Sequence, residues 1–182
     1  MNRRRLAVVV TGVGVAVGLA AVALGLGAAG GVAVHRADSP SMAPAVAVGD
    51  VVVSARPDGE PQRGDVVVFS DPGGWGQRVA RLLGQDRVPD TFVKRVVGVA
   101  GERMSCCTAA GELTVDGVPL PEPYRLPADG LASVLAFDEV VPDGAVFVLG
   151  DARSASIDSR YLGSVPLGSV TGVVQFVVPL GG

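Results

Sequence analysis

Three separated groups of polar residues could cooperate in nucleophilic catalysis. They are Ser39 and Ser41 in a proline-rich turn, Lys94 within an apolar run, and the polar stretch 150–160. A serine hydroxyl is a weak nucleophile until a neighbouring group removes its proton, and histidine is the usual base. The chain has one histidine, His35, six residues before Ser41 and beside an apolar segment. We interpret His35 as a non-catalytic polar residue, so a lysine is the candidate base.

The turn around Ser41 is conformationally restricted. Pro40 and Pro44 flank Ser41, and Pro40 pushes Ser39 toward an extended conformation. A held turn gives a hydroxyl a fixed position, which a nucleophile requires. An ordinary Ser-Pro linker between an N-terminal segment and a domain has the same composition, so the turn alone does not establish catalysis.

Lys94 lies in an apolar run that alternates like a strand. Alternation places Phe92, Lys94 and Val96 on one face. If that face is buried, desolvation lowers the pKa of Lys94, and a neutral amine can then accept a proton from serine. The alternative is a solvated lysine at a strand edge.

The stretch 150–160 contains two aspartates, two arginines and three serines. Such polar density is typical of a solvated loop. The opposition of acidic and basic side chains also fits a self-paired loop that supports a site, although exposed ion pairs contribute little. The four charged residues are Asp151, Arg153, Asp158 and Arg160.

The elements that must position these groups are predicted to be strands. Short β-branched runs are separated by Gly, Pro and Asp, which predicts an all-β, antiparallel, partly closed fold. The expected strands are 50–55, 65–70, 91–100, 103–107, 112–115, 145–149 and 169–177. A short helix is expected at 77–84, turns at 57–59 and 116–117, and an irregular surface excursion at 119–138.

An apolar segment precedes the candidate turn. No charged residue occurs between Leu6 and Val34, and a helix of this length exceeds the ~30 Å hydrocarbon core of a bilayer. We predict a transmembrane anchor at 6–35, with a cleaved secretory signal as the alternative. Three arginines precede the segment and Arg36 alone follows it closely, which places residues 1–5 in the cytoplasm and 36–182 outside.

Length and charge limit the number of domains and the kinds of partner that the chain can have. The chain has 182 residues, and the part after the anchor suits one domain. The net charge is −3 although the N-terminus carries three arginines, which argues against nucleic acid as a partner. Cys106 and Cys107 are adjacent and could oxidise outside the cytoplasm. We favour a structural or incidental role for them, with a redox switch as the alternative.

Four segments together resemble the bacterial type I signal peptidases, which are membrane-bound leader peptidases. The nucleophile segment matches at Ser39, Ser41, Met42, Pro44, Gly49 and Asp50, and the following strand at Arg63, Gly64, Asp65 and Phe69. The lysine segment matches at Val93, Lys94, Arg95, Gly98 and Gly101. The last segment matches at Gly150, Asp151, Arg153, Ser156, Asp158, Ser159, Arg160, Gly163 and Val165. The chain departs from the family pattern at Pro40, Ala45, Ala100, Glu102 and Ala152.

The resemblance implies roles for individual residues. Ser41 is the expected nucleophile and Lys94 the general base, while the Ser39 hydroxyl and the Ser41 N–H form the expected oxyanion hole. Ser156 is expected to orient the Lys94 amine by a hydrogen bond. Ion pairs between Asp158 and Arg160 and between Asp151 and Arg95 are expected to support the site. None of the departures removes a proton-transfer group.

The resemblance also implies a fold and a function. It predicts a β catalytic core with a variable β insertion at about 101–142, located outside the bacterial cytoplasmic membrane. The implied activity is removal of signal peptides from secretory preproteins after small-x-small sites, with contacts to membrane lipid and without metal or cofactor. The alternatives are an inactive membrane-tethered β module that binds exported chains or an envelope partner, and a self-cleaving serine-lysine domain like those of soluble repressors.

Overall fold

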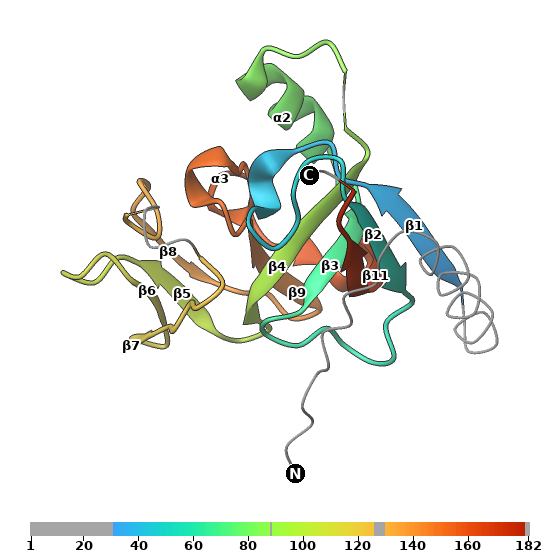
Figure 1. Cartoon of the computed structure of the whole chain (residues 1–182). Coiled ribbons are helices and arrows are strands. Elements are labelled where there is room, and N and C mark those ends of the chain that lie inside the picture. The colour runs from blue at the N-terminus through green and yellow to red at the C-terminus, as the bar shows by residue number, and fades with distance from the viewer. Residues whose placement is uncertain (1–30, 88, 126–129, 181–182) are drawn as a thin grey trace. The chain divides into compact units, whose positions relative to one another are not determined.

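Short valine-rich runs pair into two antiparallel sheets in the computed structural model, which describes residues 31–87, 89–125 and 130–180 (Figure 1). The first sheet has the order β1-β2-β11-β3-β4-β9-β10. Its strands are β1 (Val32–Arg36), β2 (Val51–Ala55), β3 (Val66–Ser70), β4 (Thr91–Val99), β9 (Ala145–Leu149), β10 (Val165–Pro166) and β11 (Val170–Val178). The pairings from β2 to β10 are all antiparallel.

The second sheet has the order β7-β6-β5-β8. Its strands are β5 (Arg103–Cys106), β6 (Leu113–Val115), β7 (Val118–Pro119) and β8 (Phe137–Val140). Asp116 and Gly117 form the turn between β6 and β7, both with positive φ, as the hairpin prediction requires. This sheet lies within 101–142, the region where the resemblance places a variable insertion. The predicted mostly β, antiparallel architecture is confirmed.

The short helices are α2 (Trp75–Leu83) and α3 (Ser159–Leu162), with 3-10 turns η1 (Pro40–Met42), η3 (Arg153–Ala155) and η4 (Leu167–Ser169). Helix α2 begins two residues before the predicted helix because the Asp71 carboxylate accepts backbone hydrogen bonds from Trp75 and Gly76, at 2.8 and 3.0 Å. Gly84 ends the helix in a left-handed conformation.

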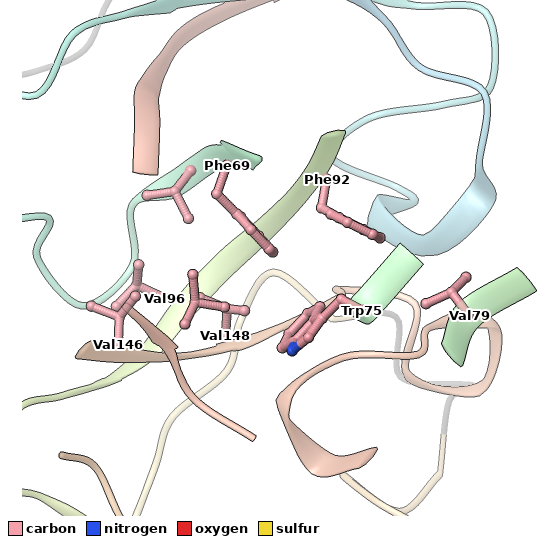
Figure 2. Close-up of a cluster of buried hydrophobic side chains, with 9 residues drawn as sticks. Phe69, Trp75, Val79, Phe92, Val96, Val146 and Val148 are labelled. Carbon is pink, nitrogen blue, oxygen red and sulfur yellow. The ribbon is translucent and has the colours of Figure 1, made fainter. Parts of the chain in front are cut away.

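Strands β4 and β9 are buried on both faces. One apolar cluster contains Val96, Val146 and Val148, against which Trp75 and Val79 of α2 pack together with Phe69 and Phe92 (Figure 2). The Phe69 ring lies 5.5 Å from Trp75 edge to face and 5.4 Å from Phe92 in a stacked pair. A second cluster on the other face contains Val97, Phe147 and Leu149 with Met104 and Leu113 from the second sheet. The uninterrupted apolar sequence of β9, Ala145–Leu149, follows from this burial.

Four of the described strands were not predicted: β1, which overlaps the predicted anchor, and β7, β8 and β10. Strands β7 and β10 have two residues each, too few for a period to be visible. Strand β8 is largely exposed and acidic, so residues 137–140 lack an apolar alternation. The predicted excursion 119–138 is therefore only partly irregular, and Ala132 and Ser133 within it are buried.

Most of the predicted transmembrane anchor lies outside the described residues. Its last residues, 31–35, are described, and 32–35 belong to β1, which lies next to β2 in the first sheet. The predicted end at residue 35 is therefore placed too late, because the β-branched Val32 and Val34 continue the sheet instead. Within residues 31–87, 89–125 and 130–180, no helix has the length and apolar character needed to cross a membrane.

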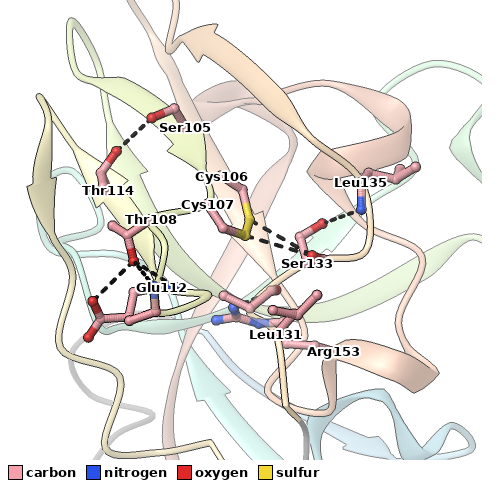
Figure 3. The surroundings of a disulfide bond; sticks show 12 residues. Ser105, Cys106, Cys107, Thr108, Glu112, Thr114, Leu131, Ser133, Leu135 and Arg153 are labelled. Atoms are coloured by element: carbon pink, nitrogen blue, oxygen red, sulfur yellow. Dashed lines mark hydrogen bonds between the residues drawn. A yellow bond between two sulfur atoms is a disulfide. The ribbon is translucent and has the colours of Figure 1, made fainter.

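Cys106 and Cys107 are joined as a disulfide at the end of β5. Their Sγ atoms lie 3.9 and 3.7 Å from the carbonyl oxygen of Ser133 (Figure 3). The pair therefore contacts the segment between β7 and β8. The redox-switch alternative stays a prediction.

Candidate active site

Ser41 is held in the short helical turn η1. Ser39 precedes this turn in an extended conformation, and its Oγ accepts a hydrogen bond from the Ser41 N–H at 3.3 Å. The Ser41 carbonyl accepts a hydrogen bond from the Ala152 N–H at 3.1 Å, which ties the turn to the polar stretch 150–160. Ser41 is buried whereas Ser39 is exposed. The backbone of the candidate nucleophile is thus fixed from two sides.

Lys94 meets Ser41 from strand β4. Its Nζ lies 2.7 Å from the Ser41 Oγ, and 53 residues separate the two in the sequence. Phe92, Lys94 and Val96 are all buried, so the predicted alternation correctly assigned the lysine to an inward face. The alternative of a solvated lysine at a strand edge is wrong, because only 5% of Lys94 is exposed.

The surroundings of Lys94 favour its neutral form. Burial lowers the pKa of Lys94 to about 8, although the carboxylates of Asp158 and Asp151 attract the proton and oppose that effect. Arg160 acts in the same direction as burial, because a second cation nearby disfavours the ammonium. Near neutral pH, roughly a tenth of the lysine is therefore already neutral. A neutral amine at hydrogen-bond distance can accept the serine proton.

Ser156 is buried, but its hydroxyl does not bond to Lys94 as the resemblance implied. The Oγ donates to Asp158 Oδ2 at 2.7 Å. A charged carboxylate is a stronger acceptor than an amine, which explains the preference. Ser156 still lies beside the nucleophile, because a Cβ at Gly150 would collide with both the Ser156 Oγ and the Ser41 carbonyl oxygen.

Asp158 and Arg160 form a buried ion pair. Arg160 Nε donates to Asp158 Oδ1 and its Nη2 donates to Oδ2, both at 2.8 Å. The Gly150 N–H also donates to Asp158, at 3.0 Å. Arg160 donates further to the carbonyls of Arg153 and Ser156, at 2.9 and 3.0 Å. The pair therefore closes the stretch 150–160 onto itself.

Asp151 and Arg95 form a second pair between this stretch and β4. Arg95 donates from Nε and Nη2 to the two carboxylate oxygens at 2.8 and 2.6 Å. Asp151 and Asp158 are both fully buried. The interpretation of 150–160 as a solvated loop is wrong, because its charges are paired within the stretch, with Arg95 of β4 or with Glu122 rather than left to water.

Two features of the site were not predicted. Gly150 is required by close packing, which a single sequence does not reveal. Arg153 was expected to pair within its own loop, but its guanidinium contacts Glu122, 31 residues earlier. Only the presence of a glutamate in a proline-rich excursion hinted at this contact. Among the described residues, no group of three or more His, Cys, Asp or Glu side chains is arranged to hold a metal ion.

The buried Asp158–Arg160 pair leads to a stability prediction. Asp158→Asn is expected to lower the free energy of unfolding by about 3–5 kcal/mol, because Arg160 keeps its charge without a charged partner in a buried site. Urea unfolding in detergent, followed by fluorescence of the one tryptophan, Trp75, measures the change. Asp138→Asn removes the exposed pair with Arg103 and is the matched control, with little expected effect. Equal effects of the two variants would contradict the prediction.

A serine hydroxyl beside a lysine of lowered pKa, on an antiparallel β scaffold, is an arrangement typical of hydrolases that use a serine nucleophile and a lysine base. The comparisons with known proteins agree with that class. The chain belongs to the signal peptidase family, peptidase S26, whose family model matches residues 9–179. The resemblance inferred from the sequence motifs is thereby confirmed.

Individual relatives carry related names. The chain is 34% identical over 156 residues to signal peptidase I of Mycobacterium tuberculosis, covering 66% of this chain and 53% of the relative. It is 34% identical over 143 residues to a probable signal peptidase I-1 of Synechocystis, covering 76% of this chain and 66% of the relative. The chain thus spans about half the length of the mycobacterial relative. A crystal structure of a signal peptidase I from Enterococcus faecalis matches with a TM-score of 0.49 and 31% identity, over 64% of this chain and 98% of that one.

Proposed function

We propose that this protein is a membrane-anchored serine endopeptidase that removes signal peptides from exported preproteins after small-x-small sites. The observation that carries the proposal is the 2.7 Å approach of Lys94 Nζ to Ser41 Oγ in a buried site. Membership of the signal peptidase family and the names of the relatives support the substrate class.

In the proposed mechanism, the Ser41 Oγ attacks the carbonyl carbon of the scissile bond and Lys94 takes the hydroxyl proton. The Ser41 N–H, which donates to the Ser39 Oγ at 3.3 Å before substrate binds, turns to the scissile carbonyl oxygen as that oxygen becomes negative. The Ser39 hydroxyl donates to the same oxygen. Lys94 then protonates the leaving amine, and an ester to Ser41 remains. A water molecule gives a proton to Lys94 and attacks the carbonyl carbon of this ester. Lys94 returns the proton to the Ser41 Oγ as the ester bond breaks, which releases the cleaved signal peptide as a carboxylic acid and restores the serine.

The proposed topology follows from the apolar segment before β1. The segment anchors the chain, with residues 1–5 in the cytoplasm and the β domain on the outer side of the bacterial cytoplasmic membrane. Because β1 starts at Val32, the span ends before that residue. Secretory preproteins and membrane lipid are the proposed partners, since a signal peptide reaches the site from the bilayer.

The test is cleavage of a preprotein with an Ala-x-Ala site by the full-length chain in detergent. We expect wild type to cut after the second alanine and Ser41→Ala to leave the preprotein intact. Sequencing of the new N-terminus identifies the bond. No cleavage by wild type, under conditions where another signal peptidase cuts the same preprotein, would reject the proposal and favour the tethered binding module.

The lowered pKa of Lys94 predicts the pH dependence of this activity. Only the neutral amine accepts the serine proton, so kcat/KM is expected to fall about tenfold per pH unit below a pKa of about 8 and to level off above it. Initial rates with one peptide substrate across the pH range measure the profile. Return of each sample to pH 8.5 controls for irreversible unfolding. A rate that stays constant down to about pH 5 would exclude a lysine base.

A further inference from the structure

We propose that Glu122 and Tyr124, in the segment between β7 and β8, are positioning residues that hold the carbonyl of Ser41 in place through the loop 151–153. The inference deepens the proposed function and rests on it. Residues outside the loop bind Asp151 and Arg153. The N–H of Ala152, which lies between these two residues, donates to the Ser41 carbonyl.

The first contact joins Glu122 to Arg153. Arg153 Nη2 donates to Glu122 Oε1, and its Nη1 donates to Oε2 at 3.1 Å. Both side chains are almost completely buried. Arg153 Nε donates in addition to the Gly150 carbonyl at 3.0 Å, and Nη1 to the Ala132 carbonyl at 3.1 Å. The guanidinium therefore connects the excursion to the loop with four hydrogen bonds.

The second contact is the stacking of the Tyr124 ring on the Arg95 guanidinium. The guanidinium carbon of Arg95 lies 4.3 Å from the centre of the Tyr124 ring, an arrangement that favours a cation on an aromatic face. The same guanidinium binds Asp151 through both carboxylate oxygens. The ring thus fixes the orientation of the arginine that holds the first residue of the loop.

A hydrogen bond between Tyr124 and Glu122 links these two contacts. The Tyr124 hydroxyl donates to Glu122 Oε1 at 2.8 Å. Burial and the neighbouring Glu122 carboxylate raise the pKa of Tyr124, so the hydroxyl stays protonated and keeps this hydrogen bond. Residues 122 and 124 therefore form one brace with two contacts on the loop.

Between Asp151 and Arg153, the Ala152 N–H donates to the Ser41 carbonyl at 3.1 Å. The Gly150 carbonyl accepts a hydrogen bond from Arg153. Gly150 also packs closely against the Ser41 carbonyl and Ser156, where a Cβ would not fit. A shift of the loop would thus move the Ser41 backbone, and with it the hydroxyl relative to Lys94. Misplacement of a reacting group by about 1 Å lowers a rate by about 100-fold.

The experiment compares Glu122→Gln, Tyr124→Leu and Tyr124→Phe in the full-length chain in detergent. Glu139→Gln is the matched control, because it makes the same chemical change on an exposed residue of the second sheet. Two readouts are used: kcat and KM for a peptide with an Ala-x-Ala site, and labelling of Ser41 by a fluorophosphonate. The rate of labelling reports the reactivity of the serine, whereas the final extent of labelling counts the folded sites.

We expect Glu122→Gln and Tyr124→Leu to lower kcat and the labelling rate by about 10- to 100-fold, with KM within about threefold of wild type and the final extent unchanged. Tyr124→Phe keeps the ring over Arg95 and loses one hydrogen bond, so its loss is expected to be several-fold smaller. Glu139→Gln is expected to behave as wild type.

Wild-type labelling rates in all three variants would overturn the brace while leaving the proposed function intact. A reduced final extent with an unchanged rate would also overturn it, because the residues would then act on folding alone. If Glu122→Gln does not fold, Tyr124→Phe decides by the same two readouts. A wild-type chain that neither cleaves the peptide nor labels at Ser41 would overturn the proposed function and the brace together.

Discussion

Replacing Lys94 with methionine is expected to lower the rate of the proposed signal-peptide cleavage by about 10⁴-fold or more, without loss of the fold. The Lys94 amine is the one basic group at hydrogen-bond distance from Ser41 Oγ among the described residues. Removal of a general base typically lowers a rate by about 10²–10⁴-fold, and by more where base and nucleophile act as a unit. Methionine has nearly the same length and suits the buried position, so the apolar surroundings need not rearrange.

The same substitution is expected to raise the stability of the protein, which separates a chemical effect from misfolding. Burial lowers the pKa of Lys94 from 10.5 to about 8, and this difference corresponds to about 3 kcal/mol of destabilisation when the amine is protonated in the folded state. The folded-state pKa lies below the unfolded value. The destabilisation is therefore complete below about pH 8 and disappears as the pH rises to 10.5.

Urea unfolding of Lys94→Met and wild type, at pH 7 and near pH 10, measures both the sign and the pH dependence. We expect a higher midpoint for the variant at pH 7 and nearly equal midpoints near pH 10. A less stable variant at pH 7 would contradict the inferred burial of an unpaired amine. A stable variant that retained cleavage would exclude Lys94 as the base.

The candidate catalytic residues Ser41 and Lys94 could be predicted from the sequence because their signals are local. Prolines around Ser41 indicate a held turn, and alternation around Lys94 indicates an inward side chain. That the turn and strand meet depends on residues 53 positions apart and follows only from the sheet order or from the family resemblance. The 2.7 Å approach itself needed the structure.

The buried charges around the pair were the harder part of the site. Charged residues are rarely buried unless they are paired, so a dense polar stretch is normally interpreted as exposed. The family resemblance predicted that Asp151 pairs with Arg95 of β4, whereas the contact of Arg153 with Glu122 in the proline-rich excursion was not predicted. Neither partner is near in sequence, and no periodic pattern marks them. Strand β8 was also not predicted, because its acidic residues do not alternate with apolar ones.

Adding one methyl group at Gly150 is expected to lower cleavage by about 100- to 1,000-fold. A Cβ at this position would lie closer to the Ser156 Oγ and to the Ser41 carbonyl oxygen than real Cβ atoms come to such neighbours. Neither neighbour can yield easily. The Ser41 carbonyl is bound to the Ala152 N–H, and the Ser156 hydroxyl is bound to the buried Asp158. Gly150→Ala must therefore displace Ser41, the loop or both.

Gly168→Ala is the matched control, because a Cβ there meets no atom within 4 Å and the backbone needs no left-handed conformation. We expect Gly168→Ala to cleave at the wild-type rate. Because a Cβ at Gly150 would press on the Ser41 carbonyl and the Ser156 hydroxyl, its substitution is expected to lower kcat more than it raises KM. A Gly150→Ala variant with wild-type kcat would show that the loop 150–153 can move without disturbing Ser41, and would thereby also weaken the case that a brace on this loop positions the nucleophile.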